Sequence, residues 1–367
     1  MSTLLPSVLC VAGDPGGASA LAPVLPKLQA DFHVCLAAYQ QALSQWSNAG
    51  YAVRPLDGSP SLDAAIAVLQ EIRPALLLTA TSVNGLDWEC HLLQAARQLG
   101  IPSISLLDFW SNYTRRFSLA EPLDALPQRI CVMDQRAVEE MVAEGFSRSM
   151  LLITGQPALD LAAQPAATDQ LQAARTLWPQ GDRRLLFVSQ PLSVLHGGDA
   201  GCNQVLGYNE HAVLSLVATV TQQLASEGRP LSLRVVPHPR ESAEVFSSAG
   251  YMVAQGHAAK VLAQAADIVI GMNSMLLLEA AAAGCVVVSV QPDLRGKDSL
   301  ATNQSRVTVP VYQAARLLPV LASLLDDSLA YATQQKLARQ MVCAGNAADC
   351  VVASVRCLLS EAIPKIS

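Results

Sequence analysis

The sequence predicts an α/β protein made of two doubly wound, Rossmann-like lobes with a central cleft. The chain has 367 residues, which is more than one hydrophobic core usually serves. Short, apolar, β-rich runs alternate with longer Ala/Leu/Gln-rich segments, as in a parallel sheet covered by helices on both faces. This alternation stops at a polar Pro/Gly-containing stretch and then begins again. Two lobes of the same class follow.

Ten runs have the composition of buried strands. In the first lobe they are Ser7 to Ala12, Phe32 to Ala37, Ala75 to Thr79, Ser103 to Leu107 and Arg129 to Met133. In the second lobe they are Leu185 to Ser189, Leu231 to Val236, Ile268 to Gly271, Val286 to Val290 and Arg306 to Val309. Helices are expected between them, including Asn209 to Glu227, Val261 to Ala266 and Ser274 to Ala283.

The expected division of the chain follows from this rhythm. Residues 1–160 form the first lobe, 161–182 a linker, 183–340 the second lobe and 341–367 a C-terminal helix. The linker contains Trp178-Pro179-Gln180-Gly181-Asp182, a segment typical of a domain boundary. The stretch Ser328 to Leu359 is amphipathic and mostly helical, and its pattern allows it to pack on either lobe.

Composition excludes several classes of protein. Hydrophobic residues make up 51% of the chain, but polar residues and prolines break the apolar runs before any could span a membrane. The net charge of -6 leaves no basic stripe for nucleic acid. Nine cysteines without CxxC pairing fit a reducing cytosol and argue against structural zinc. The N-terminus reads as a first strand and lacks the pattern of a signal peptide, so we expect a cytoplasmic protein.

The strongest motif is the stretch from Gly271 to Gly284, which follows a predicted strand. Asn273 or Ser274 can cap a helix whose free N–H groups face an anion such as a pyrophosphate. Glu279 is the one charged side chain of that helix, and a buried carboxylate needs a donor partner. That partner is either a ribose diol or a neighbouring Arg or Lys, and we favour the ribose.

Two further strand ends of the second lobe are predicted to lie at the same anion-binding edge. Val236-Pro237-His238-Pro239-Arg240 places His238 at the carboxyl edge of the sheet, where ligands bind in open α/β folds. His238 can donate to a phosphate or a sugar hydroxyl, and Arg240 can neutralise a phosphate. Ser189 and Gln190 follow the first strand of this lobe and reach the same edge.

The first lobe offers a glycine-rich turn, Gly13-Asp14-Pro15-Gly16-Gly17, between the first strand and a helix. Here Gly13, Gly16 and Gly17 let backbone approach a substrate closely. The turn matches neither GxGxxG nor a P-loop. Asp14 is a candidate general base, with a plain turn residue as the alternative.

Two later strand ends of the first lobe are predicted to open on the same cleft. Ser82 and Asn84 lie in a polar turn after the third strand, and Asp108 and Trp110 follow the fourth. Asp108 is the other candidate base. Trp110 suits a sugar face, although core packing is equally expected of it.

Together these pieces resemble the GT-B superfamily of nucleotide-sugar enzymes, over most of the chain. The resemblance rests on the Gly13 to Gly17 turn, on Ile153-Thr154-Gly155-Gln156-Pro157, on Pro237 to Arg240, and on the Gly271 to Gly284 helix. It implies that the second lobe holds a nucleotide diphosphate, with Glu279 on the ribose, and that the first lobe holds the acceptor.

Within this superfamily the chain is similar to bacterial UDP-N-acetylglucosamine 2-epimerases at the lobe junction and over Arg129 to Gly145. It departs from them elsewhere. They carry a His-Gly-Asp-like turn and a Glu where this chain has Thr79 to Ser82 and Asp108. They also carry an Asp-Ser-Gly-Gly-type turn where this chain has Gly271 to Ser274.

The sequence therefore predicts a glycosyltransferase that moves a sugar from a nucleotide sugar, of the UDP type, to the hydroxyl of a glycan or small-molecule acceptor in polysaccharide or glycoconjugate synthesis. Two alternatives stay open: a sugar-nucleotide 2-epimerase or hydrolase, and a non-catalytic nucleotide-sugar or glycan-binding protein. The scheme requires no metal and no cofactor, and a homodimer is compatible with it.

Overall fold

The structure is a computed structural model that describes residues 5–83, 86–339 and 345–362. Asn84, one of the predicted acceptor-site residues, lies outside the described residues. The contacts divide the chain into two compact units, Met1–Leu161 with Cys343–Ser367 (unit 1) and Ala162–Val342 (unit 2). Each unit is built around its own parallel sheet, so the prediction of two doubly wound α/β lobes is confirmed.

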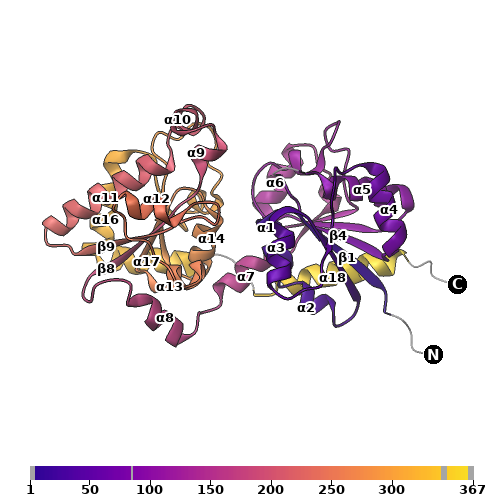
Figure 1. Cartoon of the computed structure of the whole chain (residues 1–367), viewed down its shortest axis with the longest axis horizontal. Coiled ribbons are helices and arrows are strands. Elements are labelled where there is room, and N and C mark those ends of the chain that lie inside the picture. Colours follow the sequence, from indigo (N-terminus) through magenta and orange to yellow (C-terminus); the bar gives the residue numbers. More distant parts are fainter. Residues whose placement is uncertain (1–4, 84–85, 340–344, 363–367) are drawn as a thin grey trace. The chain divides into compact units, whose positions relative to one another are not determined.

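Unit 1 contains a seven-stranded parallel sheet with the order β3-β2-β1-β4-β5-β6-β7 among the described residues (Figure 1). The strands are β1 (Ser7–Ala12), β2 (His33–Ala38), β3 (Arg54–Pro55), β4 (Leu76–Thr79), β5 (Ser103–Leu106), β6 (Arg129–Val132) and β7 (Leu151–Ile153). The five expected strands are present. β3 and β7 were not expected, because two or three residues are too few to give a β pattern.

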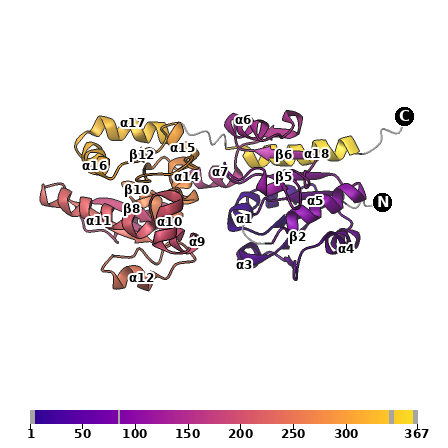
Figure 2. The same cartoon turned by 90° about the horizontal axis from the view of Figure 1, so that it is seen from above.

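Helices cover both faces of this sheet. They are α1 (Pro15–Leu21), α2 (Leu25–Leu28), α3 (Gln40–Asn48), α4 (Leu62–Ile72), α5 (Trp88–Leu99), α6 (Gln135–Ala143), α7 (Pro157–Ala163) and α18 (Ala347–Ala362). The first three and α18 pack on one face of β1, around Val8 and Cys10. The chain's last described helix, α18, thus lies beside α2 (Figure 1), as Figure 2 shows for α18 from above. Lys27 of α2 pairs with Asp349 of α18 at 2.7 Å.

Unit 2 contains a five-stranded parallel sheet with the order β12-β11-β10-β8-β9. The strands are β8 (Arg183–Val188), β9 (Leu231–Val236), β10 (Ile268–Gly271), β11 (Val286–Val290) and β12 (Val309–Val311). The last strand begins three residues later than Arg306, where the sequence placed its start. Arg306 has a φ of 58°, and the amides of Val307 and Thr308 bond the Thr302 carbonyl instead of a neighbouring strand.

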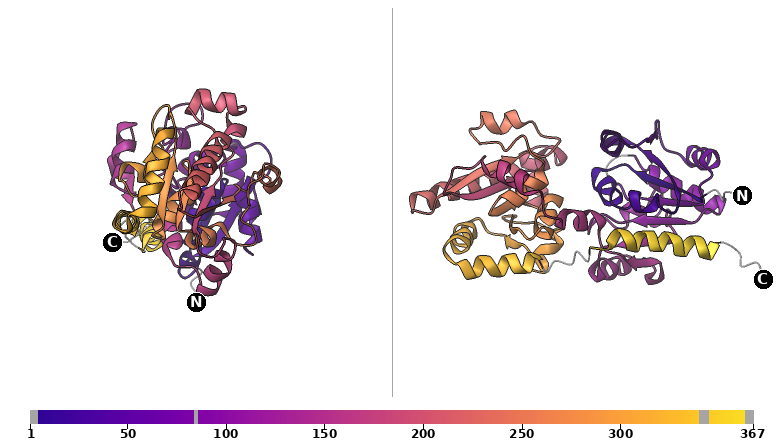
Figure 3. Two further views of the ribbon diagram at one scale, coloured as in Figure 1. Left: turned by 90° about the vertical axis from the view of Figure 1, so that its left-hand side faces the viewer. Right: turned by 90° about the horizontal axis from the view of Figure 1, so that it is seen from below.

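The helices of unit 2 are α8 (Thr168–Arg175), α9 (Leu192–Leu195), α10 (Asp199–Leu206), α11 (Glu210–Ser226), α12 (Ala243–Ser248), α13 (Ala259–Ala265), α14 (Met275–Ala282), α15 (Ala301–Gln304), α16 (Leu317–Asp326) and α17 (Ser328–Arg339). α11 and α16 contribute apolar side chains to one core cluster together with the strands. Figure 3 shows the ribbon from two further sides. α13 and α14 pack against each other, and α17 contacts both α14 and α16.

Two stretches are organised differently from the expectation. The expected linker, residues 161–182, is partly helical, because its Ala/Gln-rich piece forms α8, which packs on α13 within unit 2. The amphipathic stretch from Ser328 forms two helices, and these belong to different units: α17 to unit 2 and α18 to unit 1. Apolar periodicity marked both segments as helical, but it carries no information about which sheet a helix covers.

Candidate functional site

The carboxyl ends of three neighbouring strands bring the predicted nucleotide-sugar residues together in unit 2. Ser189 and Gln190 follow β8, His238 follows β9, and Asn273 and Ser274 follow β10. Because β10, β8 and β9 are adjacent and parallel, these strand ends form one edge of the sheet. Ligands of open α/β sheets bind at this kind of edge.

The start of α14 has a side-chain cap, as the sequence predicted. Ser274 is the N-cap, and its hydroxyl accepts a hydrogen bond from the Leu276 amide at 3.2 Å. Gly271 is buried, and a Cβ there would lie 2.8 Å from the Val188 carbonyl oxygen. Glycine at this position therefore allows β10 to lie tightly against β8 directly before the helix begins.

The turn before α14 is held by Gln190, whose Oε1 accepts from the Asn273 amide at 3.0 Å. The Asn273 side chain donates from Nδ2 to Ser299 at 3.0 Å. Its Oδ1 is buried and has no hydrogen-bond partner among the described residues. Gln190 thus supports the turn, and Asn273 presents an acceptor oxygen that the described protein atoms do not satisfy.

Glu279 lies half-buried within α14. Burial raises the pKa of its carboxyl group to about 7, and the nearby charge of Lys260 opposes that rise. No hydrogen bond to the Glu279 carboxyl forms within the described part of the chain. A ligand that donates hydrogen bonds to a carboxyl group in this position stabilises it, because those bonds offset the cost of burying the group.

His238 is held in one orientation by its own loop. Its amide donates to Glu241 Oε2 at 2.7 Å, and its Nδ1 accepts from the Arg240 amide at 3.1 Å. In the neutral ring the proton is therefore on Nε2. Burial and the adjacent Arg240 charge lower the pKa of His238, so the ring is neutral at pH 7 and donates from Nε2.

The other two residues of this loop region have different surroundings. The Ser189 hydroxyl is buried and donates to Glu241 Oε1 at 2.9 Å, so it supports the loop that carries His238. Arg240 is exposed.

In unit 1 the first turn is closely packed against the protein itself. A Cβ on Gly13 would lie 2.2 Å from the Tyr39 ring, one on Gly16 would lie 2.3 Å from Asp108 Oδ2, and one on Gly17 would lie 2.5 Å from the Ala80 methyl group. The sequence assigned these glycines to close approach of an acceptor. In the structure it is protein side chains that approach them.

Asp14 is the N-cap residue of α1 and is tied to the turn that follows β4. Its amide donates to the Ser82 hydroxyl at 2.9 Å, and its Oδ2 accepts from the Val83 amide at 2.9 Å. The predicted partners Asp14 and Ser82 are therefore brought into direct contact. Both are more than nine-tenths buried.

Asp108 forms a buried ion pair with Arg116, with 2.6 Å between Oδ1 and Nη1. The same guanidinium donates to Thr81 Oγ1 at 2.9 Å and also contacts the Thr81 carbonyl oxygen. Asp108 thus joins the ends of β4 and β5 through an arginine that the sequence analysis did not single out. Arg116 lies eight residues further along the chain than Asp108, and no motif connects the two.

Trp110 has its ring buried, and its indole N–H donates to Asp134 Oδ2 at 2.9 Å. Asp134 is the N-cap of α6. Of the two roles that the sequence left open for Trp110, this geometry matches core packing.

Sequence reasoning missed Glu89, a buried residue of α5 that is 3% exposed. Its Oε1 accepts from the Ser82 hydroxyl at 2.6 Å, and its Oε2 contacts the Tyr39 hydroxyl. Burial raises the pKa of the Glu89 carboxyl to about 7. The available signal was its helical spacing with Leu92, Leu93 and Ala96, which puts a carboxyl group on the apolar face of the helix.

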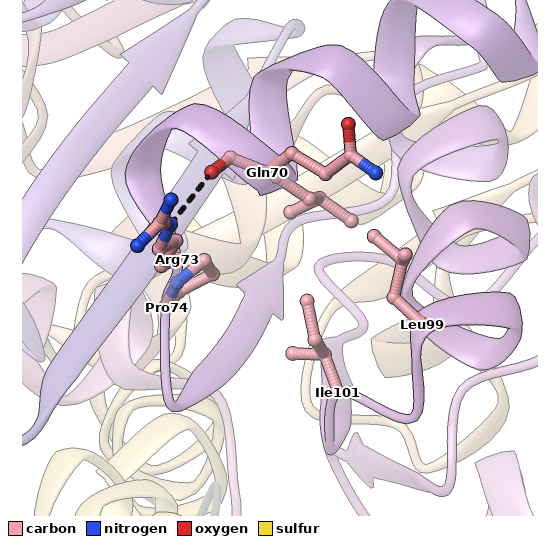
Figure 4. A pocket seen from close by; sticks show the side chains of 6 residues that line it. Gln70, Arg73, Pro74, Leu99 and Ile101 are labelled. Carbon is pink, nitrogen blue, oxygen red and sulfur yellow. Dashed lines mark hydrogen bonds between the residues drawn. The ribbon is translucent and has the colours of Figure 1, made fainter.

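Two hollows of the surface differ in where they lie. One of about 550 Å³ is lined by Asp293, Leu294, Gly296, Asp298 and Tyr312, which follow β11 and β12 at the carboxyl edge of the unit 2 sheet. Another of about 500 Å³ is lined by Leu69, Gln70, Arg73, Pro74, Leu99 and Ile101, at the amino ends of β4 and β5 (Figure 4). Its arginine is turned back to the Gln70 carbonyl, with 3.2 Å between Nε and O. Without several polar groups converging on it, this hollow is a weaker candidate than the two sheet edges.

No family model and no curated protein matches this sequence. Solved structures do match the fold. The UDP-GlcNAc 2-epimerase from Neisseria meningitidis, solved bound to UDP-GlcNAc, is 14% identical with a TM-score of 0.69, over 95% of this chain and 99% of its own. HepE from Anabaena, solved in complex with UDP, is 14% identical with a TM-score of 0.66, over 98% and 100%. The glycotransferase of kitacinnamycin is 15% identical with a TM-score of 0.66, over 97% and 99%.

The chain has the GT-B fold. The superfamily resemblance read from the sequence is therefore confirmed at the level of fold. At these identities the similarity concerns fold alone, and residue roles must come from the geometry of this chain.

Three further observations concern metal binding, membrane crossing and the cysteines. Among the described residues, no group of three or more His, Cys, Asp or Glu side chains is arranged to hold a metal ion. No described helix has the length and apolar character needed to cross a membrane. The eight cysteines in the described ranges are free thiols.

Proposed function

We propose that this protein is a glycosyltransferase that moves a sugar from a nucleotide sugar of the UDP type to an acceptor hydroxyl. The donor site is the carboxyl edge of the unit 2 sheet. The observation that carries this proposal is Glu279, a half-buried carboxyl group without a hydrogen-bond donor among the described residues, on the helix that begins at that edge.

The donor site combines three kinds of group. The start of α14 supplies amide N–H groups and the positive end of the helix dipole for a diphosphate. His238 supplies a neutral N–H donor at the neighbouring strand end, and exposed Arg240 supplies a positive charge. Glu279 accepts hydrogen bonds from a ribose diol, which resolves its lack of a donor.

The proposed chemistry is a direct transfer. Asp14 takes the proton of the acceptor hydroxyl as that oxygen bonds to the anomeric carbon of the donor sugar. The bond from that carbon to the diphosphate oxygen breaks, and the leaving diphosphate is stabilised by the α14 start and His238. Asp14 is preferred to Asp108 as the base because the Asp108 carboxylate is already engaged by Arg116.

A second candidate is a sugar-nucleotide 2-epimerase or hydrolase. The observation that favours it is the gathering of Asp14, Glu89 and Asp108 around the ends of β1, β4 and β5. Removing and returning a proton on a sugar carbon needs at least two acid–base groups, and this cluster supplies three carboxyl groups.

The test begins with ligand-dependent thermal unfolding of the full chain with UDP, GDP, CMP, dTDP and ADP. A ligand at about 100 times its dissociation constant adds about 2.7 kcal/mol to the free energy of unfolding. We expect stabilisation by UDP and its sugar conjugates. The absence of a shift with every nucleotide would contradict the donor site.

Turnover of UDP-N-acetylglucosamine and of other UDP-sugars then separates the candidates. A transferase releases UDP only when an acceptor is present and yields a glycosylated acceptor. An epimerase gives the 2-epimer of the nucleotide sugar without any acceptor. Binding without either product identifies a non-catalytic binding protein.

A further inference from the structure

Glu89, which the proposed transfer does not use, sits at the centre of a buried hydrogen-bond network in unit 1. The network joins the ends of three strands, because Asp14 follows β1, Tyr39 follows β2 and Ser82 follows β4, while Glu89 comes from α5. The four residues are each at least nine-tenths buried. Water therefore makes no hydrogen bonds to these groups. Each donor proton of the network can then be assigned to one acceptor atom.

The count starts at Tyr39. Its hydroxyl lies 2.7 Å from the Leu86 carbonyl oxygen and is also in contact with Glu89 Oε2. A carbonyl oxygen only accepts, and a tyrosine hydroxyl has one proton. If Tyr39 donates to Leu86, the proton between Tyr39 and Glu89 must come from the carboxyl group.

The count continues at Ser82. Its oxygen accepts from the Asp14 amide, so its single proton goes to Glu89 Oε1 at 2.6 Å. With Tyr39 donating to Leu86, Glu89 accepts on Oε1 and donates from Oε2. With Tyr39 donating to Glu89 instead, the Leu86 carbonyl loses its hydrogen bond from Tyr39. Every hydrogen bond of the network is made when Glu89 is a neutral carboxylic acid, and one is lost when it ionises.

The surroundings of Glu89 agree with this count. Among the described residues, the titratable groups that interact with Glu89 include Tyr39, Asp14 and, on its own helix, Cys90, and none of these three is cationic. Burial, followed by the charge of Asp14, raises the pKa of the Glu89 carboxyl to about 7, and the hydrogen bonds that Ser82 and Tyr39 can donate to its ionised form oppose that rise.

We propose that Glu89 is a positioning residue, a neutral carboxylic acid that fixes the Ser82 hydroxyl and through it the Asp14 amide, and so holds the proposed general base in place. Glu89 does not touch substrate in this account. The assignment of Asp14 as a base rests on the proposed function, whereas the neutral state of Glu89 and its hold on Asp14 do not.

Two substitutions separate this role from ordinary packing. In Glu89→Gln the amide group reproduces the neutral acid, because Nε2 donates to Tyr39 and Oε1 accepts from Ser82. Glu89→Ala removes both bonds. The exposed Glu139→Gln, on α6, is the matched control for loss of a carboxylate.

The first measurement is hydrogen exchange of the Asp14 amide, which requires no activity. We expect about a tenfold loss of protection in Glu89→Ala, in line with one lost hydrogen bond, and wild-type protection in Glu89→Gln. Equal protection in all variants, or equal loss in Glu89→Ala and Glu89→Gln, would overturn the positioning role.

The second measurement is stability against pH, in the wild type and Glu89→Gln. The native carboxyl keeps a proton that the unfolded chain releases above its ordinary pKa of 4.5. The wild type should therefore lose stability relative to Glu89→Gln between about pH 4.5 and 7, and the difference should level off above pH 7. Parallel curves would show that Glu89 is not held neutral.

The third measurement is the pH profile of turnover. Wild-type activity should fall as Glu89 ionises above about pH 7, and Glu89→Gln should remove that fall while Glu89→Ala is impaired at every pH. An inactive Glu89→Gln with wild-type protection at Asp14 would assign Glu89 to the chemistry itself and overturn the proposal. Absence of turnover in the wild type contradicts the proposed function, and the first two measurements still decide the role of Glu89.

Discussion

Glu89 in unit 1 and Glu279 in unit 2 are both carboxyl groups on helices, and burial raises the pKa of each to about 7. Their surroundings differ. Glu89 is enclosed by Ser82 and Tyr39, whereas Glu279 has Lys260 nearby and no hydrogen bond within the described ranges. A raised pKa alone therefore does not identify a ligand site. The hydrogen bonds distinguish Glu89, which is already hydrogen-bonded within the protein, from Glu279, which has no hydrogen-bond donor among the described residues.

The same contrast holds for the two sheet edges. In unit 1 the glycine turn, Asp14 and Asp108 are occupied by contacts with Tyr39, Ser82 and Arg116. In unit 2 the edge keeps a His238 N–H, the start of a capped helix, and an Asn273 oxygen that has no hydrogen-bond partner among the described residues. We therefore assign chemistry to unit 1 and donor binding to unit 2, and the following changes test that division.

The largest effect is expected for Asp14→Asn, which retains the side-chain oxygen that the Val83 amide contacts but removes the base. Turnover should fall by about 100-fold to 10,000-fold, the usual range for loss of a general base, with UDP affinity unchanged. Steady-state kinetics with parallel calorimetric titration of UDP measures both. A variant that lost affinity and kept its turnover number would place Asp14 in donor binding.

The next effect is expected for Glu279→Ala. Loss of charge-assisted hydrogen bonds to a ribose costs about 1.5–3 kcal/mol, which weakens UDP binding by about 10-fold to 150-fold. Glu89→Gln is the matched change in the other unit and should leave the UDP dissociation constant as it is. Equal losses of UDP affinity in the two variants would show that the two carboxyl groups do not differ in their role in UDP binding.

UDP affinity should also depend on pH through Glu279. In the proposed complex the carboxylate accepts from both ribose hydroxyls, so only the ionised form would be fully competent, and it becomes populated as pH rises through about 7. We expect affinity to increase by about tenfold from pH 6 to pH 8. Because the diphosphate titrates as well, the comparison is with Glu279→Gln, in which the Glu279 contribution disappears. Identical pH curves would remove Glu279 from the site.

The smallest effect is expected for Arg240→Ala. Arg240 is exposed, and an exposed ion pair contributes about 0–1 kcal/mol that salt screens. UDP affinity should fall by at most about fivefold at low ionic strength and by less in high salt. A loss as large as that of Glu279→Ala would mean that Arg240 is enclosed when ligand is bound.

The sequence predicted the architecture well because strand composition and helix periodicity are local signals. The five strands expected in unit 1, the Ser274 cap and the end of α14 before Gly284 are all found. The short β7 and the start of β12 were not predicted correctly, because pairing with neighbours decides them.

The candidate site was predicted less completely. Residues at strand ends, such as His238 and Asp14, can be found from sequence because parallel strands end at one edge. Arg116 and Glu89 depend on where a long loop and a helix face lie, and a single sequence does not encode those contacts as a motif. Trp110 and the Gly13 turn look the same in sequence whether a ligand or the protein itself surrounds them.

The most direct test of the donor site is hydrogen-exchange mass spectrometry of the full chain with and without UDP. The account predicts slower exchange in the peptides that cover Gly271 to Glu279 and Val236 to Glu241, and no such change in Glu279→Ala at the same UDP concentration. Slower exchange confined to other segments, or none at saturating UDP, would contradict the assignment of nucleotide-sugar binding to unit 2.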